Sequence, residues 1–464
     1  MVFSGLTFLF CFLPAVLALY FTAPRSAKNA VLFLASLLFY AWGEPVYVVL
    51  MIFSTILDYT CGRMVERARG PRGRKLWLIF SLTGNLGLLL FFKYADFLLG
   101  TLDSVLGTSL PQLALPLPIG ISFYTFQTMS YTIDVYRGEV RAQRNIVDFG
   151  AYVSLFPQLI AGPIVRYRDI AEQLKKRTHS FDSFGEGARR FVTGLAKKVV
   201  LANNIGLLHE TIAATPASGL TVVGAWLGMF AFAFQIYFDF SGYSDMAIGL
   251  GRMFGFTFPE NFAYPYIAAS VTDFWRRWHI SLGSWFRDYV YIPLGGNRRG
   301  MLRHIRNIAV VWLLTGLWHG ASLNFLCWGA YYGLLLIFEK YVLRRCLSRA
   351  PKPVGHLYTI FAVLIGYVWF SFDNLAAGAA YLGAMFGHCS GMVNDRTLYL
   401  FLTNLPLLIV CTVASTPVVP KLRGLVHREP LLTAAQLLSM TAMIVLSVAY
   451  LIGGSYNPFL YFRF

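Results

Sequence analysis

Long runs of apolar residues, nearly free of charge, recur along the 464 residues of this chain. Several approach the roughly 20 residues that an α-helix needs to cross a bilayer, although others are shorter. Backbone groups in lipid must be paired internally, so these runs are expected to be helical. The pattern predicts an all-α polytopic membrane protein with about ten to twelve transmembrane helices, some of them tilted, re-entrant or broken. The clearest runs are 5–21, 31–42, 46–59, 222–238, 358–370, 398–413 and 431–451.

No low-complexity linker or tandem repeat divides the chain, which predicts a single membrane domain over 1–464. Its core motifs fall within 115–330, and C-terminal helices are expected over 355–455. A less apolar segment, 164–198, mixes Lys and Arg with phenylalanines. This mixture predicts interfacial amphipathic helices on the cytoplasmic side.

A second segment of this kind covers 273–306 and begins with an apolar stripe at steps of three to four residues. The stripe predicts one helix that rests at a membrane interface or lines a water-filled cavity. Its members are Phe274, Trp275, Trp278, Leu282, Trp285 and Phe286, and Arg276, Arg277, Arg287 and Asp288 fall largely on the other side.

Composition excludes a soluble fold, because hydrophobic residues make up 57% of the chain and charged residues only 13%. The net charge of +17 does not indicate a nucleic-acid partner, since Lys and Arg lie in short loops between apolar runs.

The positive-inside rule places the clusters 63–75, 166–198, 298–306 and 344–352 in the cytoplasm. Counting back three spans predicts an external N-terminus, in a multi-pass protein of the cytoplasmic (inner) membrane surrounded by membrane lipids. The first run is expected to be a retained span, because it lacks a positive n-region and a cleavage site.

Several classes of chemistry have no sequence signal. The six cysteines are scattered without metal-ligand or redox spacing, so no metal is expected. No Gly-rich phosphate loop or nucleophile elbow is present, so nucleotide-driven pumping is not supported.

His319 is the sharpest candidate for chemistry. Between positions 307 and 338 there is no Asp, Glu, Lys or Arg. These residues are too many for one span, and Gly316, Gly320, Ser322 and Asn324 offer places for the helix to turn back. From Arg306, helical rise carries His319 roughly 20 Å into a core of about 30 Å. There the imidazole is either a general base or proton relay, or a neutral residue bonded to a neighbouring helix.

His279 falls on the same side of the predicted helix as Trp275, Leu282 and Phe286. It is either a partner of His319 or a packing residue. The other six histidines are expected in loops or at span ends, in solvated or interfacial roles: His179, His209, His304, His356, His388 and His427.

Two carboxylates, Asp239 and Asp245, interrupt the apolar stretch that also contains Ser241. A straight helix places residues six apart roughly 120° apart around its axis, and a broken helix would change that. Acids at membrane depth line polar pockets or ion paths, or hold the fold together. A structural or pocket-lining role is favoured here over catalysis.

Five motifs, in this order, resemble those of the alginate-type O-acyltransferases of the membrane-bound O-acyltransferase family. They occupy 117–124, 156–163, 237–245, 274–281 and 317–320, and the likeness extends from Met1 to at least Asn324. The resemblance implies that His319, in the Trp-His-Gly motif, is catalytic and that His279 lies along the same channel. Other branches of the family carry Asn at the second position. Trp318, Asp239, Ser241, Asp245, Trp275 and Trp278 are then expected to line the pocket.

The resemblance also implies a ring of helices around a central tunnel, with no bound cofactor. The acyl donor would be acetyl-CoA or an acylated carrier protein on the cytoplasmic side, where Arg276, Arg277 and Arg287 would steer an anion. The acceptor would be an exported polysaccharide such as alginate, and a separate extracytoplasmic acyltransferase with a nucleophilic Ser would complete the transfer.

Two alternatives remain open. The D-alanyl-transfer branch shares the histidine motifs, although 1–4 and 156–163 are more similar to the alginate type. A proton-coupled transporter would use His319, Asp239 and Asp245 as a relay. Inverted repeats would favour the transporter, and the sequence has no evident ones.

Overall fold

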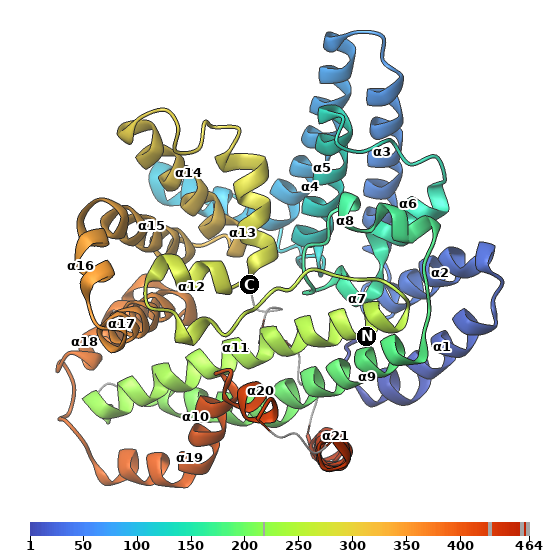
Figure 1. Cartoon of the computed structure of the whole chain (residues 1–464). Helices are drawn as coiled ribbons and strands as arrows, with labels where there is room; N and C mark the ends of the chain where they lie inside the picture. The colour runs from blue at the N-terminus through green and yellow to red at the C-terminus, as the bar shows by residue number, and fades with distance from the viewer. Residues whose placement is uncertain (217–218, 426–428, 455–458, 461–464) are drawn as a thin grey trace. The chain divides into compact units, whose positions relative to one another are not determined.

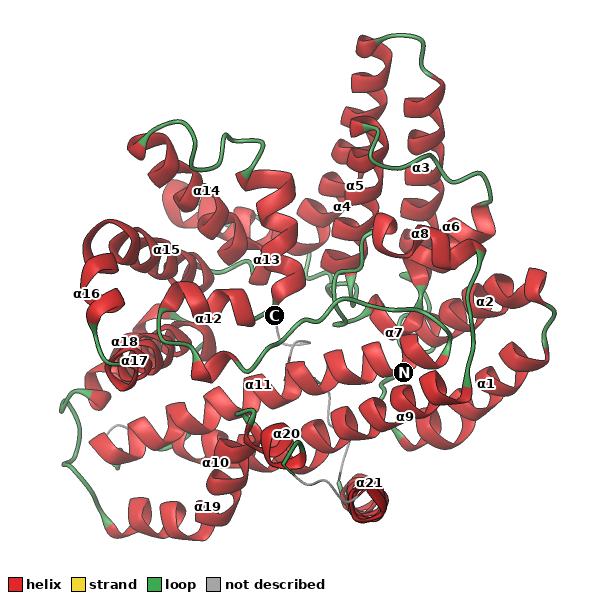
Figure 2. Cartoon of the chain, viewed as in Figure 1, coloured by secondary structure: helices red, strands yellow, loops and turns green. Residues whose placement is uncertain are grey.

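The computed structural model describes residues 1–216, 219–425, 429–454 and 459–460. Within these ranges every regular element is a helix (Figure 2). His427 lies outside the described residues. The all-α prediction is therefore confirmed for the part of the chain that the structure describes.

Eight helices in the described ranges are long and apolar enough to cross a membrane. Two shorter apolar helices, Phe8–Thr22 and Leu375–Met385, accompany them. The chain is thus a multi-pass membrane protein, while the predicted number of ten to twelve spans stays a prediction. The eight are Val48–Arg67, Pro71–Leu106, Phe181–Ala213, Val222–Met253, Leu323–Arg349, Lys352–Ser371, Asp395–Ala414 and Leu432–Gly453.

The described chain divides into two compact units, one of residues 1–191 with 243–259 and the other of 192–242 with 260–464. The single membrane domain over 1–464 stays a prediction. Besides the helices named below, the elements are α1 (Leu13–Thr22), α7 (Phe156–Leu159), α10 (Asn203–Ala213), α16 (Arg344–Arg349), α18 (Leu375–Met385), α19 (Asp395–Ala414), α20 (Val418–Arg423) and α21 (Glu429–Gly453).

In the first unit, α3 (Val48–Arg67), α4 (Pro71–Leu106) and α5 (Ile121–Arg137) pack against one another, and α2 (Lys28–Ala41) packs on α6 (Ile146–Ser154) (Figure 1). Two of the sequence motifs meet here. Gly120, at φ +77°, caps the start of α5, and a Cβ on it would lie 2.8 Å from the carbonyl oxygen of Leu159. Only glycine combines that conformation with so close an approach.

In the second unit, α14 (Met301–His319) and α15 (Leu323–Phe338) form a hairpin, and α15 also packs on α17 (Lys352–Ser371) (Figure 1). Two glycines allow the close approach of α14 and α15. A Cβ on Gly316 would lie 2.3 Å from the carbonyl oxygen of Phe325, and one on Gly329 would lie 2.4 Å from that of Trp312. Small residues at a helix crossing are typical of membrane proteins, where close packing replaces the hydrophobic effect.

The segment 164–198 differs in part from its prediction. The short amphipathic helix α8 (Tyr167–Lys175) agrees with an interfacial role. However, α9 (Phe181–Ala196) opens a continuous helical stretch, Phe181–Ala213, that ranks among the candidate spans. The interfacial position of these helices stays a prediction, and Lys198, at the end of the segment, is buried and paired with Asp239.

The segment 273–306 is not one helix, which corrects the prediction from its apolar stripe. It forms α12 (Val271–Arg277), α13 (Ile280–Phe286), a π-helical turn at Arg287–Tyr291, and the start of α14. Periodicity could not reveal the break between α12 and α13, because hydrogen bonds from the irregular segment 261–263 stabilise it.

Candidate active site

His319 is the last residue of α14, and Gly320 caps the helix. The amide of Gly320 still bonds to the carbonyl of Gly316 at 3.3 Å, after which the chain turns and α15 begins at Leu323. Asn324 donates from its side chain to the carbonyl of Phe372, at the end of α17. The predicted turn after His319 is confirmed, and it holds the imidazole at the closed end of the hairpin.

Aromatic rings surround the His319 imidazole, which is only 7% exposed. Its ring centre lies 5.0 Å from that of Trp318, 4.9 Å from Trp328 and 5.2 Å from Phe370, each in an edge-to-face arrangement. This enclosure excludes most solvent, and electrostatic interactions are stronger in such surroundings.

His279 occupies the break between α12 and α13, with a left-handed backbone at φ +46°. The backbone of residues 261–263 provides hydrogen-bond partners for the backbone on both sides of this break. The amide of Ile280 donates to the carbonyl of Asn261 at 3.0 Å, and the amide of Ala263 donates to the carbonyl of Arg277 at 2.9 Å. A non-glycine residue in this conformation is uncommon and often marks a functional position.

The side chain of Asn261 determines the tautomer of His279. Its Oδ1 accepts from Ser281 Oγ at 2.9 Å and lies 3.1 Å from His279 Nδ1. Because an amide oxygen can only accept, Nδ1 carries the proton and Nε2 keeps its lone pair. Nε2 is buried and has no hydrogen-bond partner among the described residues. Burial lowers the pKa of His279 to about 3, so the ring is neutral at physiological pH.

Trp318 connects the two histidines. Its ring centre lies 5.8 Å from that of His279 and 5.0 Å from that of His319. The structure therefore brings together two residues that are forty positions apart in sequence, which is the arrangement that a partnership of His279 with His319 requires.

Two cavities meet at His319. The larger, about 530 Å³, is lined by both histidines and by Arg276, Trp275 and Trp278, among others. The smaller, about 30 Å³, has room for about one water molecule. Among the described residues, His319, Trp275 and Trp278 are the ones that line both of them.

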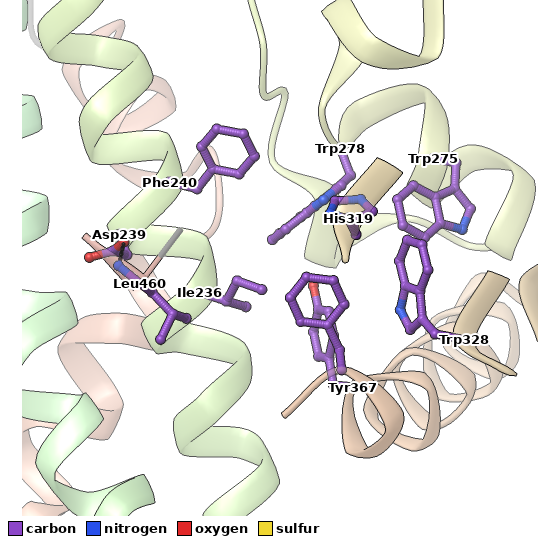
Figure 3. Close-up of a pocket in the computed structure, with 10 residues that line it drawn as sticks. Ile236, Asp239, Phe240, Trp275, Trp278, His319, Trp328, Tyr367 and Leu460 are labelled. Atoms are coloured by element: carbon purple, nitrogen blue, oxygen red, sulfur yellow. Dashed lines mark hydrogen bonds between the residues drawn. The ribbon is translucent and has the colours of Figure 1, made fainter. Parts of the chain in front are cut away.

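Asp239 lines the smaller cavity, opposite the tryptophans. Figure 3 shows Asp239 and Leu460 on one side of Ile236 and Phe240, with His319, Trp275 and Trp328 on the other. One carboxylate oxygen pairs with Lys198, and the other accepts from the amide of Leu460 at 2.8 Å. The carboxylate of Asp239 is thus both structural and pocket-lining, as the sequence favoured.

Ser241 and Asp245 line neither of these two cavities. Asp245 belongs to the first unit, where it pairs with Arg190 at 3.0 Å. Their helix, α11 (Val222–Met253), is continuous through both carboxylates, so the straight-helix geometry holds.

The three arginines proposed for donor steering differ in their surroundings. Arg276 lines the larger cavity, and no carboxylate pairs with it among the described residues. Arg277 binds Asp273 at 3.0 Å and does not line that cavity. Arg287 lines it but is paired with Asp288 at 2.8 Å.

Sequence reasoning missed several residues of this site. Asn261 and Phe370 gave no local signal, because only the fold places them beside the histidines. Trp328 lies in an apolar run typical of any span, yet its indole Nε1 is buried without an acceptor among the described residues. His304 and His209 are also buried, 4% and 7% exposed, so a solvated role was wrong for both, while an interfacial role stays a prediction.

Comparison with known proteins identifies the class of this site. The profile of the MBOAT, membrane-bound O-acyltransferase family, matches residues 119–379. A "Probable alginate O-acetylase AlgI" of Pseudomonas putida is 40% identical over 493 aligned positions that cover both chains completely. The chain belongs to the membrane-bound O-acyltransferase family. As a member, it is an O-acyltransferase of the membrane, and the expectation from its motifs is confirmed.

Two other relatives of this O-acyltransferase carry different names. A "Peptidoglycan O-acetyltransferase" of Helicobacter pylori is 35% identical over 83% of this chain and 80% of its own. A "Teichoic acid D-alanyltransferase" of Bacillus subtilis is 27% identical over 54% of this chain and 65% of its own. The O-acetylating branch is therefore much more similar to this chain than the D-alanyl-transfer branch.

Proposed function

We propose that this membrane-bound O-acyltransferase takes an acetyl group from a cytoplasmic thioester and passes it across the membrane for O-acetylation of alginate. The observation that carries the proposal is the position of His319, which stands where a large cavity and a small one meet inside an aromatic enclosure. The printed name of the Pseudomonas putida relative supports alginate as the acceptor polymer.

The chemistry assigns His319 as general base. As the acceptor oxygen attacks the thioester carbonyl, its proton moves to the imidazole and the carbon–sulfur bond breaks. The departing thiolate then takes that proton, which restores neutral His319. General base assistance of this kind contributes about 10²–10⁴-fold in rate.

His279 has a supporting role in this proposal. Its unprotonated Nε2 accepts a hydrogen bond from a group of the bound substrate, in the same cavity that His319 lines. Its proton on Nδ1 is held by Asn261, so the ring cannot easily change tautomer.

The donor is acetyl-CoA or an acylated carrier protein, and Arg276 is the arginine best placed to attract it. A separate extracytoplasmic acyltransferase with a nucleophilic Ser receives the acetyl group and delivers it to the exported polymer. The N-terminus is external, and the basic clusters face the cytoplasm of a cell with this protein in its inner membrane.

The proton-relay alternative has less support. Asp239 is held by Lys198 and by the amide of Leu460, and Asp245 is held by Arg190. Both carboxylates are therefore already engaged in ion pairs, which favours a structural role over a relay.

The test is the His319→Ala variant, assayed in neutral-lipid nanodiscs for transfer of labelled acetyl from acetyl-CoA and from an acylated carrier protein. Transfer is expected to fall by about 10²-fold or more. A His356→Ala variant, changed in a half-buried histidine that lines neither cavity, serves as the matched control. Normal transfer by His319→Ala would remove the base from the proposal.

A further inference from the structure

A third cavity, about 630 Å³, adjoins the larger cavity at the histidines. The two share Thr272, Arg276, Tyr291, Val311, Trp312 and Leu336 as lining residues. A molecule seated in the third cavity therefore reaches toward the two histidines without crossing another part of the fold.

The charged residues of this third cavity are strongly unbalanced. Arg276, Lys340 and Arg344 line it, and none of them pairs with a carboxylate among the described residues. Lys340 and Arg344 are one helical turn apart, on consecutive turns of one helical stretch. Arg276 comes from a different segment, α12, and lines the same cavity.

Glu339 is the carboxylate among the lining residues, and it is already fully engaged. Its oxygens accept from the amides of Val271 at 2.6 Å and Thr272 at 2.9 Å, and from the Thr272 hydroxyl at 2.6 Å. It thus caps the N-terminus of α12, where a negative charge is stabilised by the helix dipole. Glu339 carries one negative charge against three positive ones, so the lining keeps a net positive charge.

His304 holds Lys340 in position. The Lys340 ammonium lies 3.2 Å from His304 Nε2, and an ammonium can only donate. Nε2 is therefore the acceptor, and Nδ1 carries the proton that it donates to the Tyr341 hydroxyl at 2.6 Å. The buried, neutral His304 orients the ammonium and leaves its charge uncompensated.

We infer that this cavity binds the phosphate group of the thioester donor, between Arg276, Lys340 and Arg344. Arginine forks and a lysine ammonium are the usual partners of phosphate, and charge-assisted bonds to it are the strong ones. A phosphate that carries a pantetheine arm is common to coenzyme A and to carrier proteins, so the cavity is suited to either source. The inference rests on the proposed function, because it assumes that the adjoining cavity receives the thioester.

The test measures binding and not turnover. Protein in neutral-lipid nanodiscs, in both the wild type and the His319→Ala background, is titrated with coenzyme A, 4′-phosphopantetheine and pantetheine by calorimetry. The phosphorylated probes are expected to bind about tenfold or more tightly than pantetheine, since hydrogen bonds between charged groups and phosphate are the strong ones. Lys340→Gln and Arg344→Gln should reduce this advantage without changing the affinity for pantetheine, and Arg344→Lys should restore part of it.

Arg345→Gln is the matched control, because Arg345 is exposed and neighbours Arg344 but does not line the cavity.

Competition by adenosine 3′,5′-bisphosphate would indicate that the nucleotide phosphates of coenzyme A occupy the site. Competition by phosphopantetheine alone would indicate the arm of a carrier protein, and both outcomes support a phosphate site. Equal affinities for pantetheine and its phosphate would overturn the inference, as would loss of the phosphate advantage when phosphatidylglycerol is added, which would assign the cations to lipid headgroups. Because binding is read in the His319→Ala background, failure of this inference is distinct from failure of the proposed catalytic role.

Discussion

His279 donates a hydrogen bond from Nδ1 to Oδ1 of Asn261 over 3.1 Å, and this bond leaves Nε2 as the nitrogen with a free lone pair. The two residues are eighteen positions apart and meet only because the 261–263 backbone enters the break between α12 and α13. A histidine in a left-handed conformation thus acquires one fixed tautomer.

The buried neutral state of His279 predicts an acid-sensitive fold. Its pKa is about 6.5 when exposed and is lowered by burial to about 3. Above pH 6.5 neither state binds a proton, so this group adds no pH dependence. As pH falls below that value, only the unfolded state is protonated, and the free energy of unfolding falls by at most about 1.4 kcal/mol per pH unit. Thermal unfolding in nanodiscs between pH 7 and pH 5 should therefore show a steeper loss for wild type than for His279→Asn. Parallel curves for the two proteins would contradict the assignment.

The Lys198–Asp239 pair should be strongly coupled, because both side chains are buried. Removing one partner leaves an unpaired buried charge, so Asp239→Leu or Lys198→Met alone should cost about 3–5 kcal/mol. The double variant should cost much less than the sum of the two single changes. A double-mutant cycle on unfolding in mild detergent measures this coupling. The exposed pair of Arg252 and Glu186 is the control, expected to couple by about 1 kcal/mol or less.

The glycines of the α14–α15 hairpin should determine the position of His319. In Gly316→Ala the new methyl group would meet the carbonyl of Phe325 at 2.3 Å, and backbone cannot move aside as a side chain can. The helices must separate, which should cost about 1–3 kcal/mol and reduce acetyl transfer. Gly333→Ala is the matched control, since its Cβ would meet only the Trp312 side chain at 3.3 Å. Equal activity of both variants would show that close packing of the hairpin does not position the base.

The topology predicts that single cysteines at 63–75 and at 298–306 are protected from an impermeant thiol reagent in sealed cells. In the first unit, Lys28 and Arg177 both lie over the ring of Tyr20, at 4.5 and 5.8 Å. Counting spans from an external N-terminus places Lys28 in the cytoplasm, and the positive-inside rule places the basic segment that contains Arg177 there too. Their contact with the same ring agrees with one location for both. Labelling in intact and permeabilised cells measures the accessibility. Efficient labelling in intact cells would reverse the orientation.

The helical membrane class and the two histidines were accessible from the sequence because they rest on local signals. Apolar runs of sufficient length require helices wherever lipid surrounds them. The isolation of His319 in an uncharged stretch, followed by Gly320 and Asn324, indicated both the residue and the turn after it. The split of 273–286 into two helices could not be predicted, since its apolar stripe has helical spacing throughout.

The sequence by itself determined that this chain is a helical, multi-pass protein of the membrane-bound O-acyltransferase family, and it indicated His319 as the residue proposed for its chemistry. Only the tertiary structure decided which side chains meet around the site. Asn261 bonds to His279, Lys198 pairs with Asp239, and Lys340 and Arg344 line the same cavity as Arg276. The physical reason is the distance along the chain over which each kind of interaction acts. Hydrophobic length and helix-ending residues act over a few turns of one helix, whereas a tautomer, an ion pair and a cluster of cations depend on groups that only the folded chain brings within hydrogen-bonding or Coulomb distance.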